Sequence, residues 1–105
     1  MNNERRRAPR HQLVAEAEIV SPLSDVRLEA RTSDVSLVGC FMNTKYALSP
    51  GTEIQLQIKY EGASFAASGE VARSEASMGF GVSFGDMKAA EQTLLRKWLE
   101  GLTAR

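Results

Sequence analysis

The chain has 105 residues, of which 43% are hydrophobic and 25% are charged, values that indicate one globular domain of ordinary soluble composition. Thirteen basic residues balance thirteen acidic ones, and a pI near 6.6 argues against a dedicated nucleic-acid-binding domain, whose pI usually exceeds about 9. A single cysteine, Cys40, excludes an internal disulfide and fits a reducing compartment.

Positive charge is concentrated at the start of the chain. The first ten residues contain one glutamate and four arginines, a side-chain charge of +3: Arg5, Arg6, Arg7 and Arg10. A solvated terminus would explain such a cluster on charge alone, because chain termini are often poorly ordered. The use of arginine rather than lysine favours binding, since the guanidinium fork grips phosphate or the O6/N7 edge of guanine through two hydrogen bonds. We therefore expect residues 1–12 to form a flexible, ligand-binding segment.

The next segment predicts a β-hairpin. Residues 13–20 place apolar side chains on one face and Glu16 and Glu18 on the other, which is the period of a strand with one dry face. Residues 26–31 alternate in the same way, and the intervening segment 21–25 has the composition of a turn.

Further strands are predicted in the middle of the chain. Three segments alternate apolar residues with polar or small ones: 53–60, 64–73 and 78–84. The polar stretch 32–39 and the segment 43–51, which ends in a Pro-Gly turn signal, are expected to connect strands.

From Asp86 onward the apolar spacing becomes helical, with an apolar stripe that includes Leu94, Leu95, Trp98 and Leu99. Asp86 is expected to cap a helix over 86–103, because its carboxylate can accept from free backbone N–H groups. About six short strands followed by one helix predict a mostly-β domain over 13–105, an antiparallel barrel or sandwich on which the helix packs.

Neither a secretory signal nor a membrane span is visible in the sequence. The first apolar stretch begins at Leu13 and contains Glu16 and Glu18, which a secretory apolar region would not carry. Nothing approaches the 18 consecutive apolar residues of a membrane helix. We therefore expect a cytoplasmic protein.

No catalytic or metal-binding constellation stands out. The chain has one histidine, His11, and one cysteine, Cys40, whereas a metal site needs three or four ligands. The sequence alone does not exclude that Cys40 and His11 form a nucleophile pair, although a small buried cysteine in the segment GCFM is the simpler explanation. We expect a binding protein rather than an enzyme, with no metal and no cofactor.

The segment DVSLVG, residues 34–39, has two interpretations. It can be a polar link between strands with an Asx or Ser turn and a flexible glycine. It can also be part of a binding site. Asp34 would then hold an arginine fork or accept from a guanine N–H edge, Ser36 would bind a phosphate, and Gly39 would let the backbone approach a ligand closely.

The arginine cluster and this segment together resemble the signature of the PilZ family. Arg6 and Arg10 match its R-x-x-x-R motif, and Asp34, Ser36 and Gly39 match its D-x-S-x-x-G motif. ALSPGTEIQLQI, SGEVAR, MGFGVSF and MKAAEQTLLRKWL are similar to the family's later strands and terminal helix, so the likeness covers nearly the whole chain. It implies a six-stranded antiparallel β-barrel flanked by a C-terminal helix.

The resemblance also implies a receptor for cyclic di-GMP, a bacterial second messenger of two guanosines joined by two phosphates. It assigns contacts with the guanines and phosphates to Arg6 and Arg10, and the other side of the site to the Asp34–Gly39 motif. In similar members an arginine at the position of Arg5 accompanies an intercalated ligand dimer, so we expect two ligands per chain. Arg7 is an additional candidate contact.

Arg73 stands where many members carry an aromatic residue, and its guanidinium plane could replace a base-stacking ring. Ligand ordering of the charged segment would change the surface offered to an effector protein, which predicts a signalling adaptor. Two alternatives remain. One is a ligand-blind interaction module, and the other is a small barrel that binds single-stranded nucleic acid, although no aromatic ladder for base stacking is visible.

Overall fold

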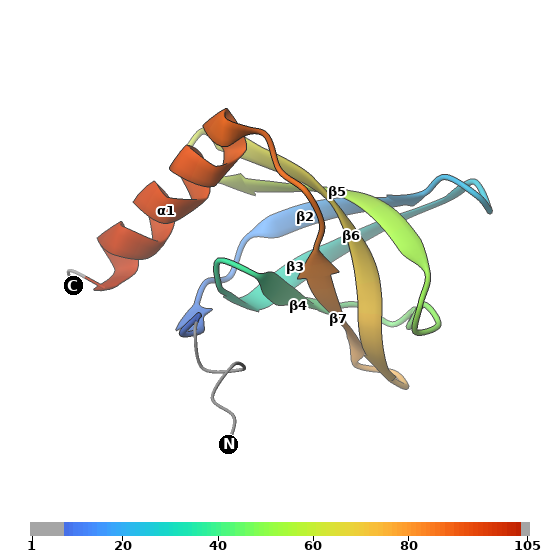
Figure 1. Cartoon of the computed structure of the whole chain (residues 1–105). Coiled ribbons are helices and arrows are strands. Elements are labelled where there is room, and N and C mark those ends of the chain that lie inside the picture. The colour runs from blue at the N-terminus through green and yellow to red at the C-terminus, as the bar shows by residue number, and fades with distance from the viewer. Residues whose placement is uncertain (1–7, 104–105) are drawn as a thin grey trace, which may run out of the picture.

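The computed structural model of the chain describes residues 8–103. They form seven strands and one helix: β1 (His11–Gln12), β2 (Glu16–Ser21), β3 (Val26–Val35), β4 (Gly39–Asn43), β5 (Glu53–Tyr60), β6 (Ala63–Glu75), β7 (Gly79–Phe84) and α1 (Ala89–Thr103). Figure 1 shows the strands wrapped into a barrel, with α1 lying beside one of its ends. Within the described range, no helix has the length and apolar character needed to cross a membrane.

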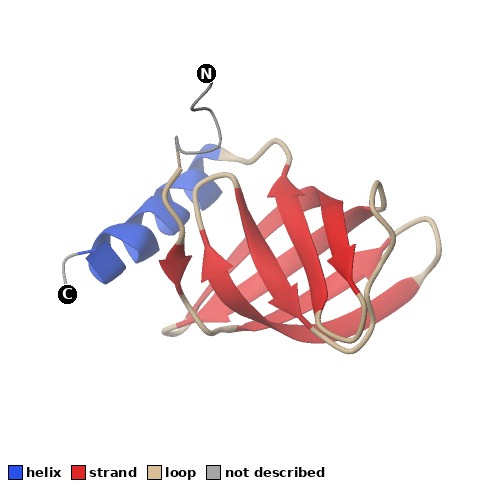
Figure 2. Cartoon of the chain, turned by 90° about the horizontal axis from the view of Figure 1, so that it is seen from below, coloured by secondary structure: helices blue, strands red, loops and turns tan. Residues whose placement is uncertain are grey.

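The strands close into an antiparallel barrel. Neighbours follow the order β3-β2-β5-β6-β7-β4, and β4 pairs with β3 to complete the circle. Closure removes the unpaired strand edges that would otherwise expose backbone donors and acceptors. The two-residue β1 is added to this barrel by pairing with the end of β3 (Figure 2). The predicted fold, a six-stranded antiparallel barrel with a C-terminal helix, is confirmed.

The alternation of apolar and polar residues in the sequence corresponds to the inner and outer faces of the barrel. Apolar residues at alternate positions of β2, β5 and β7 are buried: Ala17, Ile19, Ile54, Leu56, Ile58, Phe80 and Val82. Of the residues that alternate with them, Glu16 and Gln55 are exposed, Glu18 and Gln57 are partly exposed, and Gly81 is buried. The predicted hairpin is present, with Ile19 of β2 directly opposite Leu28 of β3.

Helix α1 packs its apolar stripe against the barrel. Leu95, Trp98 and Leu99 are buried. The Trp98 ring lies edge-on to Tyr60, with 5.3 Å between centroids, and 6.1 Å from the ring of Phe65. Each large apolar side chain buried in this way contributes roughly 1.5–3 kcal/mol, which holds the helix on the barrel.

The start of α1 differs from the prediction. The helix begins at Ala89, because the carbonyl of Lys88 accepts the first helical hydrogen bonds, from the N–H groups of Glu91 at 3.0 Å and Gln92 at 3.1 Å. Asp86 is therefore not its N-cap. The Glu91 carboxylate in the first turn accepts the N–H of Ala66 at 2.8 Å, which ties the helix to β6.

Strand β3 is longer than the hairpin pattern predicts. It continues to Val35 through a stretch expected to be a connection, because it gains partners on both edges. Asp34 and Val35 pair with Phe41 and Cys40 of β4 on one side. On the other side they pair with β1. Cross-strand pairing outweighs the low β propensity of the polar residues here, so Asp34 stands on a strand.

The expected N-terminal segment is also paired in part. Residues 1–7 lie outside the described residues. Among the others, Ala8 is buried, and His11 and Gln12 lie opposite Val35 and Asp34. The end of β3 thus provides a partner strand for the last part of a segment that the sequence predicts to be loose.

Candidate functional site

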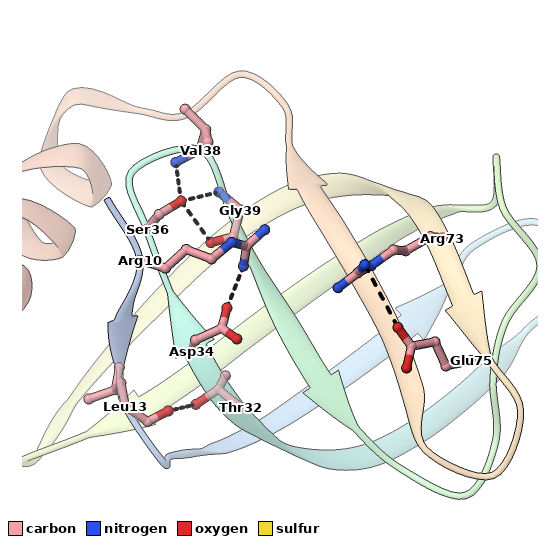
Figure 3. Close-up of polar contacts among 9 residues, drawn as sticks. All are labelled: Arg10, Leu13, Thr32, Asp34, Ser36, Val38, Gly39, Arg73 and Glu75. Carbon is pink, nitrogen blue, oxygen red and sulfur yellow. Dashed lines mark hydrogen bonds and ion pairs between the residues drawn. The ribbon is translucent and has the colours of Figure 1, made fainter. Parts of the chain in front are cut away.

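Arg10 and Asp34 lie in contact although they are 24 positions apart in the chain. Strand β1 pairs Gln12 with Asp34 and so carries Arg10, two residues earlier, to the same place. There Nη1 of Arg10 donates to Oδ1 of Asp34 and forms an ion pair (Figure 3). The two side chains keep 54% and 33% of their surface exposed. Exposed ion pairs contribute only about 0–1 kcal/mol, so a ligand can replace this one at low cost.

Ser36 shapes the turn that follows β3. Its side chain is buried, and its hydroxyl oxygen accepts the N–H groups of Val38 at 3.1 Å and Gly39 at 3.2 Å. The same hydroxyl donates to the carbonyl of Gly39 at 3.3 Å (Figure 3). The Ser turn, one of the two interpretations of this segment, is therefore present. The hydroxyl that was expected to bind a phosphate forms its hydrogen bonds within the protein instead.

Gly39 is required by the packing of two strands. It lies opposite Ser83 where β4 pairs with β7. A Cβ at this position would lie 2.2 Å from the carbonyl oxygen of Val82, a backbone atom that cannot move without disturbing β7. Close approach of a strand, rather than of a ligand, accounts for the glycine in this structure.

A row of directly opposed residues crosses the outer wall of the barrel beside the ion pair. Asp34 of β3 faces Phe41 of β4, Phe41 faces Gly81 of β7, and Gly81 faces Arg73 of β6. Opposed residues of antiparallel strands share a face. That face is the outer one, because the alternate residues Cys40 and Met42 are fully buried. We call Asp34, Phe41, Gly81 and Arg73 the outer row.

Both charged ends of the outer row follow an irregularity in the sheet. The register of β3 against β4 shifts between Thr32 and Asp34, and that of β6 against β7 shifts between Val71 and Arg73. A β-bulge inserts a residue and re-aims the side chain next to it. Each bulge thus places a charged residue at an end of the outer row.

The middle of the outer row is a low, partly aromatic floor. Arg73 lies over the ring of Phe41, with its guanidinium carbon 5.7 Å from the ring centroid. Nη1 of Arg73 is also 3.8 Å from Oε2 of Glu75, as Figure 3 shows. The Arg73 side chain crosses Gly81, since a Cβ there would lie 3.4 Å from Cγ and Nε of Arg73. It covers the Phe41 ring, and Phe41 is only 8% exposed. The sequence names Asp34 and Arg73 as site residues but not Phe41 or Gly81. One signal in the sequence could have indicated Phe41, because it is an aromatic residue between Cys40 and Met42, whose side chains face the inside of the barrel.

Cys40 is not placed to act as a nucleophile. It is fully buried, and burial, reinforced by the charge of Asp34, raises the pKa of its thiol to about 12. Val35 lies between Cys40 and His11 across the three strands, so the two residues are not neighbours in the sheet. Among residues 8–103, no group of three or more His, Cys, Asp and Glu is arranged to hold a metal ion.

The remaining predicted contacts, Arg5, Arg6 and Arg7, lie outside the described residues. The structure thus brings together Arg10 and Asp34, gives Ser36 and Gly39 internal roles, and places Arg73 at the far end of the outer row.

A closed six-stranded antiparallel barrel with a C-terminal helix, whose outer wall carries the Arg10–Asp34 pair and the outer row, defines the class of small β-barrel domains. The family model described as PilZ domain matches residues 4–101. The chain therefore belongs to the PilZ family, and PilZ domains are a family of cyclic di-GMP receptors. Comparison with curated protein sequences gives no significant match.

Solved structures of other proteins share the fold. The PilZ domain of CeSA from a cellulose-synthesizing bacterium is 13% identical, with a TM-score of 0.74 over 90% of this chain and 98% of that one. The PilZ domain of YcgR from Escherichia coli, solved with c-di-GMP, is 15% identical, with a TM-score of 0.77 over 95% and 92%. The Bacillus subtilis inhibitor of motility, MotI/DgrA, is 17% identical, with a TM-score of 0.74 over 96% of this chain and 53% of that one.

Proposed function

We propose that this protein binds cyclic di-GMP on the outer wall of its barrel, between Arg10 and Arg73. The contact of Arg10 with Asp34 carries the proposal, since it joins the two halves of the family signature beside the outer row. The PilZ domain of YcgR, which shares the fold, was solved with this ligand.

The side chains at the site suit a dianion with two purine bases. The Arg10 guanidinium would bind a phosphate or the O6/N7 edge of a guanine. Asp34, released from Arg10 or sharing it, would accept from the N–H groups of a guanine edge. Arg73, whose guanidinium carbon lies over the Phe41 ring, would offer a cationic plane for base stacking, which contributes about 1–3 kcal/mol per base.

The arginines before residue 8 complete the proposal from their motif positions alone. We propose that Arg6 shares the ligand with Arg10, that Arg5 supports a second, intercalated ligand, and that Arg7 adds positive charge. Several such contacts are needed together, because fixing about six residues on a ligand costs roughly 6–12 kcal/mol, whereas one charge-assisted hydrogen bond contributes about 1.5–3 kcal/mol.

We also propose that ligand binding is signalled to an effector protein. Pro9 and His11 flank the ligand contact Arg10, and with Leu37 of the turn and Leu99 of α1 they line a groove of about 330 Å³. A ligand that moves Arg10 or the turn would change the shape of this groove, and hence the surface that the protein presents.

Calorimetric titration of the full chain tests the proposed ligand, with cyclic di-AMP as the control. We expect saturable binding of two molecules of cyclic di-GMP per chain. Cyclic di-AMP should bind at least about 10-fold more weakly, because adenine lacks the O6 acceptor and the N2–H donor of guanine. No heat with either nucleotide would favour a ligand-blind interaction module, and equal affinity for both would contradict guanine recognition.

Filling the floor of the outer row should weaken binding without unfolding the barrel. In Gly81→Val, the added Cβ would lie 3.4 Å from Cγ and Nε of Arg73 and 3.8 Å from Cδ1 of Phe41, which are all side-chain atoms. The two methyl groups beyond it would displace the flexible Arg73 side chain rather than the backbone of the sheet. We expect the Kd for cyclic di-GMP to rise about 10-fold or more, equivalent to about 1.4 kcal/mol. Gln55→Val, on the exposed face of β5, is the control and should leave the Kd unchanged. An unaltered Kd in Gly81→Val would place the ligand elsewhere.

A further inference from the structure

The edge of β3 that carries the site is covered by two strands with a gap between them. Strand β1 pairs with the end of β3, β2 pairs with its beginning, and residues 13–15 separate the two. At this gap Leu13 N–H donates to the carbonyl of Ser33 at 3.2 Å, and Thr32 N–H donates to the carbonyl of Ala15 at 2.9 Å. The regular ladder is therefore interrupted where the chain leads from β1 into β2.

The side chain of Thr32 bridges this gap. It is completely buried, and its hydroxyl donates to the carbonyl of Leu13 at 2.5 Å while accepting the N–H of Ala15 at 3.0 Å (Figure 3 shows the first of these). Leu13 and Ala15 are themselves buried, so water cannot replace the hydroxyl easily. A buried hydroxyl with both its donor and its acceptor engaged fixes the geometry of the groups that it joins.

Thr32 also connects the two halves of the site. Its bonds hold the chain three residues after Arg10, and its own strand carries Asp34 two residues later, just past the bulge between Thr32 and Asp34. We propose that Thr32 is the positioning residue that holds β1, and with it Arg10, against Asp34. Thr32 would touch no ligand itself. Its effect on ligand affinity rests on the proposed cyclic di-GMP function, whereas its effect on the position of β1 does not.

The first test needs no ligand. In Thr32→Val, which keeps the shape but has no hydroxyl, the amide proton of Leu13 should exchange with solvent about 10-fold faster or more, since its bond to Ser33 depends on β1 staying in place. Thr32→Ser, which keeps the hydroxyl, should restore slow exchange. The amide of Ile19 is the reference, because it lies inside β2 with strands on both sides. In all variants, its exchange rate should keep the same ratio to the rate expected from global unfolding. Unchanged protection of Leu13 in Thr32→Val would overturn the proposal.

The second test asks whether this positioning reaches the ligand. Thr32→Val should raise the Kd for cyclic di-GMP about 10-fold, Thr32→Ser should stay within about 3-fold of the unmodified protein, and the effect of Thr32→Val should disappear when Arg10 is already alanine. Ser21→Ala is the matched control. It removes a buried hydroxyl, bonded to Ser24 at 2.8 Å, at the other end of β2, and should lower the melting temperature without changing the Kd.

The outcomes separate the two proposals. If the unmodified chain binds no cyclic di-GMP, the proposed function fails, while the exchange of Leu13 still decides the role of Thr32. If the ligand binds and Thr32→Val weakens binding equally with and without Arg10, then Thr32 stabilises the fold only and the positioning role is wrong.

Discussion

Arg10→Ala is expected to weaken binding of cyclic di-GMP by roughly 10- to 150-fold. The substitution removes a charge-assisted contact of about 1.5–3 kcal/mol, and it leaves Asp34 as an unbalanced negative charge beside a dianionic ligand. Because the ion pair is exposed and Arg10 lies before the barrel strands, the fold should survive. Calorimetry measures the first effect and circular dichroism the second.

A surface arginine outside the site serves as the control for this result. Arg27 also forms one ion pair, with Glu18 at 2.8 Å, and its side chain is 65% exposed, close to the 54% of Arg10. It lies near the start of β3, whereas Asp34 lies near the end. Arg27→Ala should leave the Kd unchanged. Equal affinities for Arg10→Ala and the unmodified protein would remove Arg10 from the site.

From motif position alone, Arg6→Ala should behave like Arg10→Ala.

Gly39→Ala is expected to destabilise the barrel by about 3 kcal/mol, the upper end for overpacking. The new Cβ would lie 2.2 Å from the carbonyl oxygen of Val82 and 3.3 Å from its carbonyl carbon, so β4 and β7 would have to separate where they pair. Urea unfolding followed by circular dichroism gives the change in the free energy of unfolding.

Another glycine supplies the comparison. Gly101 lies in α1, where an added Cβ would meet nothing within 4 Å. Gly101→Ala should therefore stabilise the protein by about 0.5–1 kcal/mol, the ordinary gain from replacing glycine in a helix. If Gly39→Ala keeps its stability and loses only ligand affinity, then Gly39 serves the ligand, as the family resemblance implies, and the strand-packing explanation is wrong.

The fold was predictable because its signals are local. Alternation along 13–20 and 53–60 marks the inward face of a strand in any antiparallel barrel, and the stripe around Leu95 and Trp98 marks a helix that packs on it. The start of α1 was less predictable, because a polar residue such as Asp86 can precede a helix without capping it. Strand boundaries such as the extension of β3 to Val35 depend on which partners arrive from elsewhere in the chain.

The site was predictable only in part, because register decides which residues share a surface. Arg10 and Asp34 could be paired from their motifs, but the sequence does not show that Phe41 and Gly81 complete the row between Asp34 and Arg73. Ser36 shows the opposite problem. A hydroxyl in a binding motif can serve either a ligand or the turn that displays the motif, and only the three-dimensional contacts of Ser36 distinguish these roles.

The most direct test of the account is a titration of the isotopically labelled chain with cyclic di-GMP, followed in the two-dimensional spectrum of its N–H groups. We predict that the amide signals of Arg10, Asp34 and Gly81 and the side-chain Nε–H signal of Arg73 shift until the site is saturated, while the amide of Arg27 stays in place. Signals of Arg10, Asp34 and Gly81 that remain unmoved in a saturating excess of the nucleotide would contradict binding on this wall of the barrel.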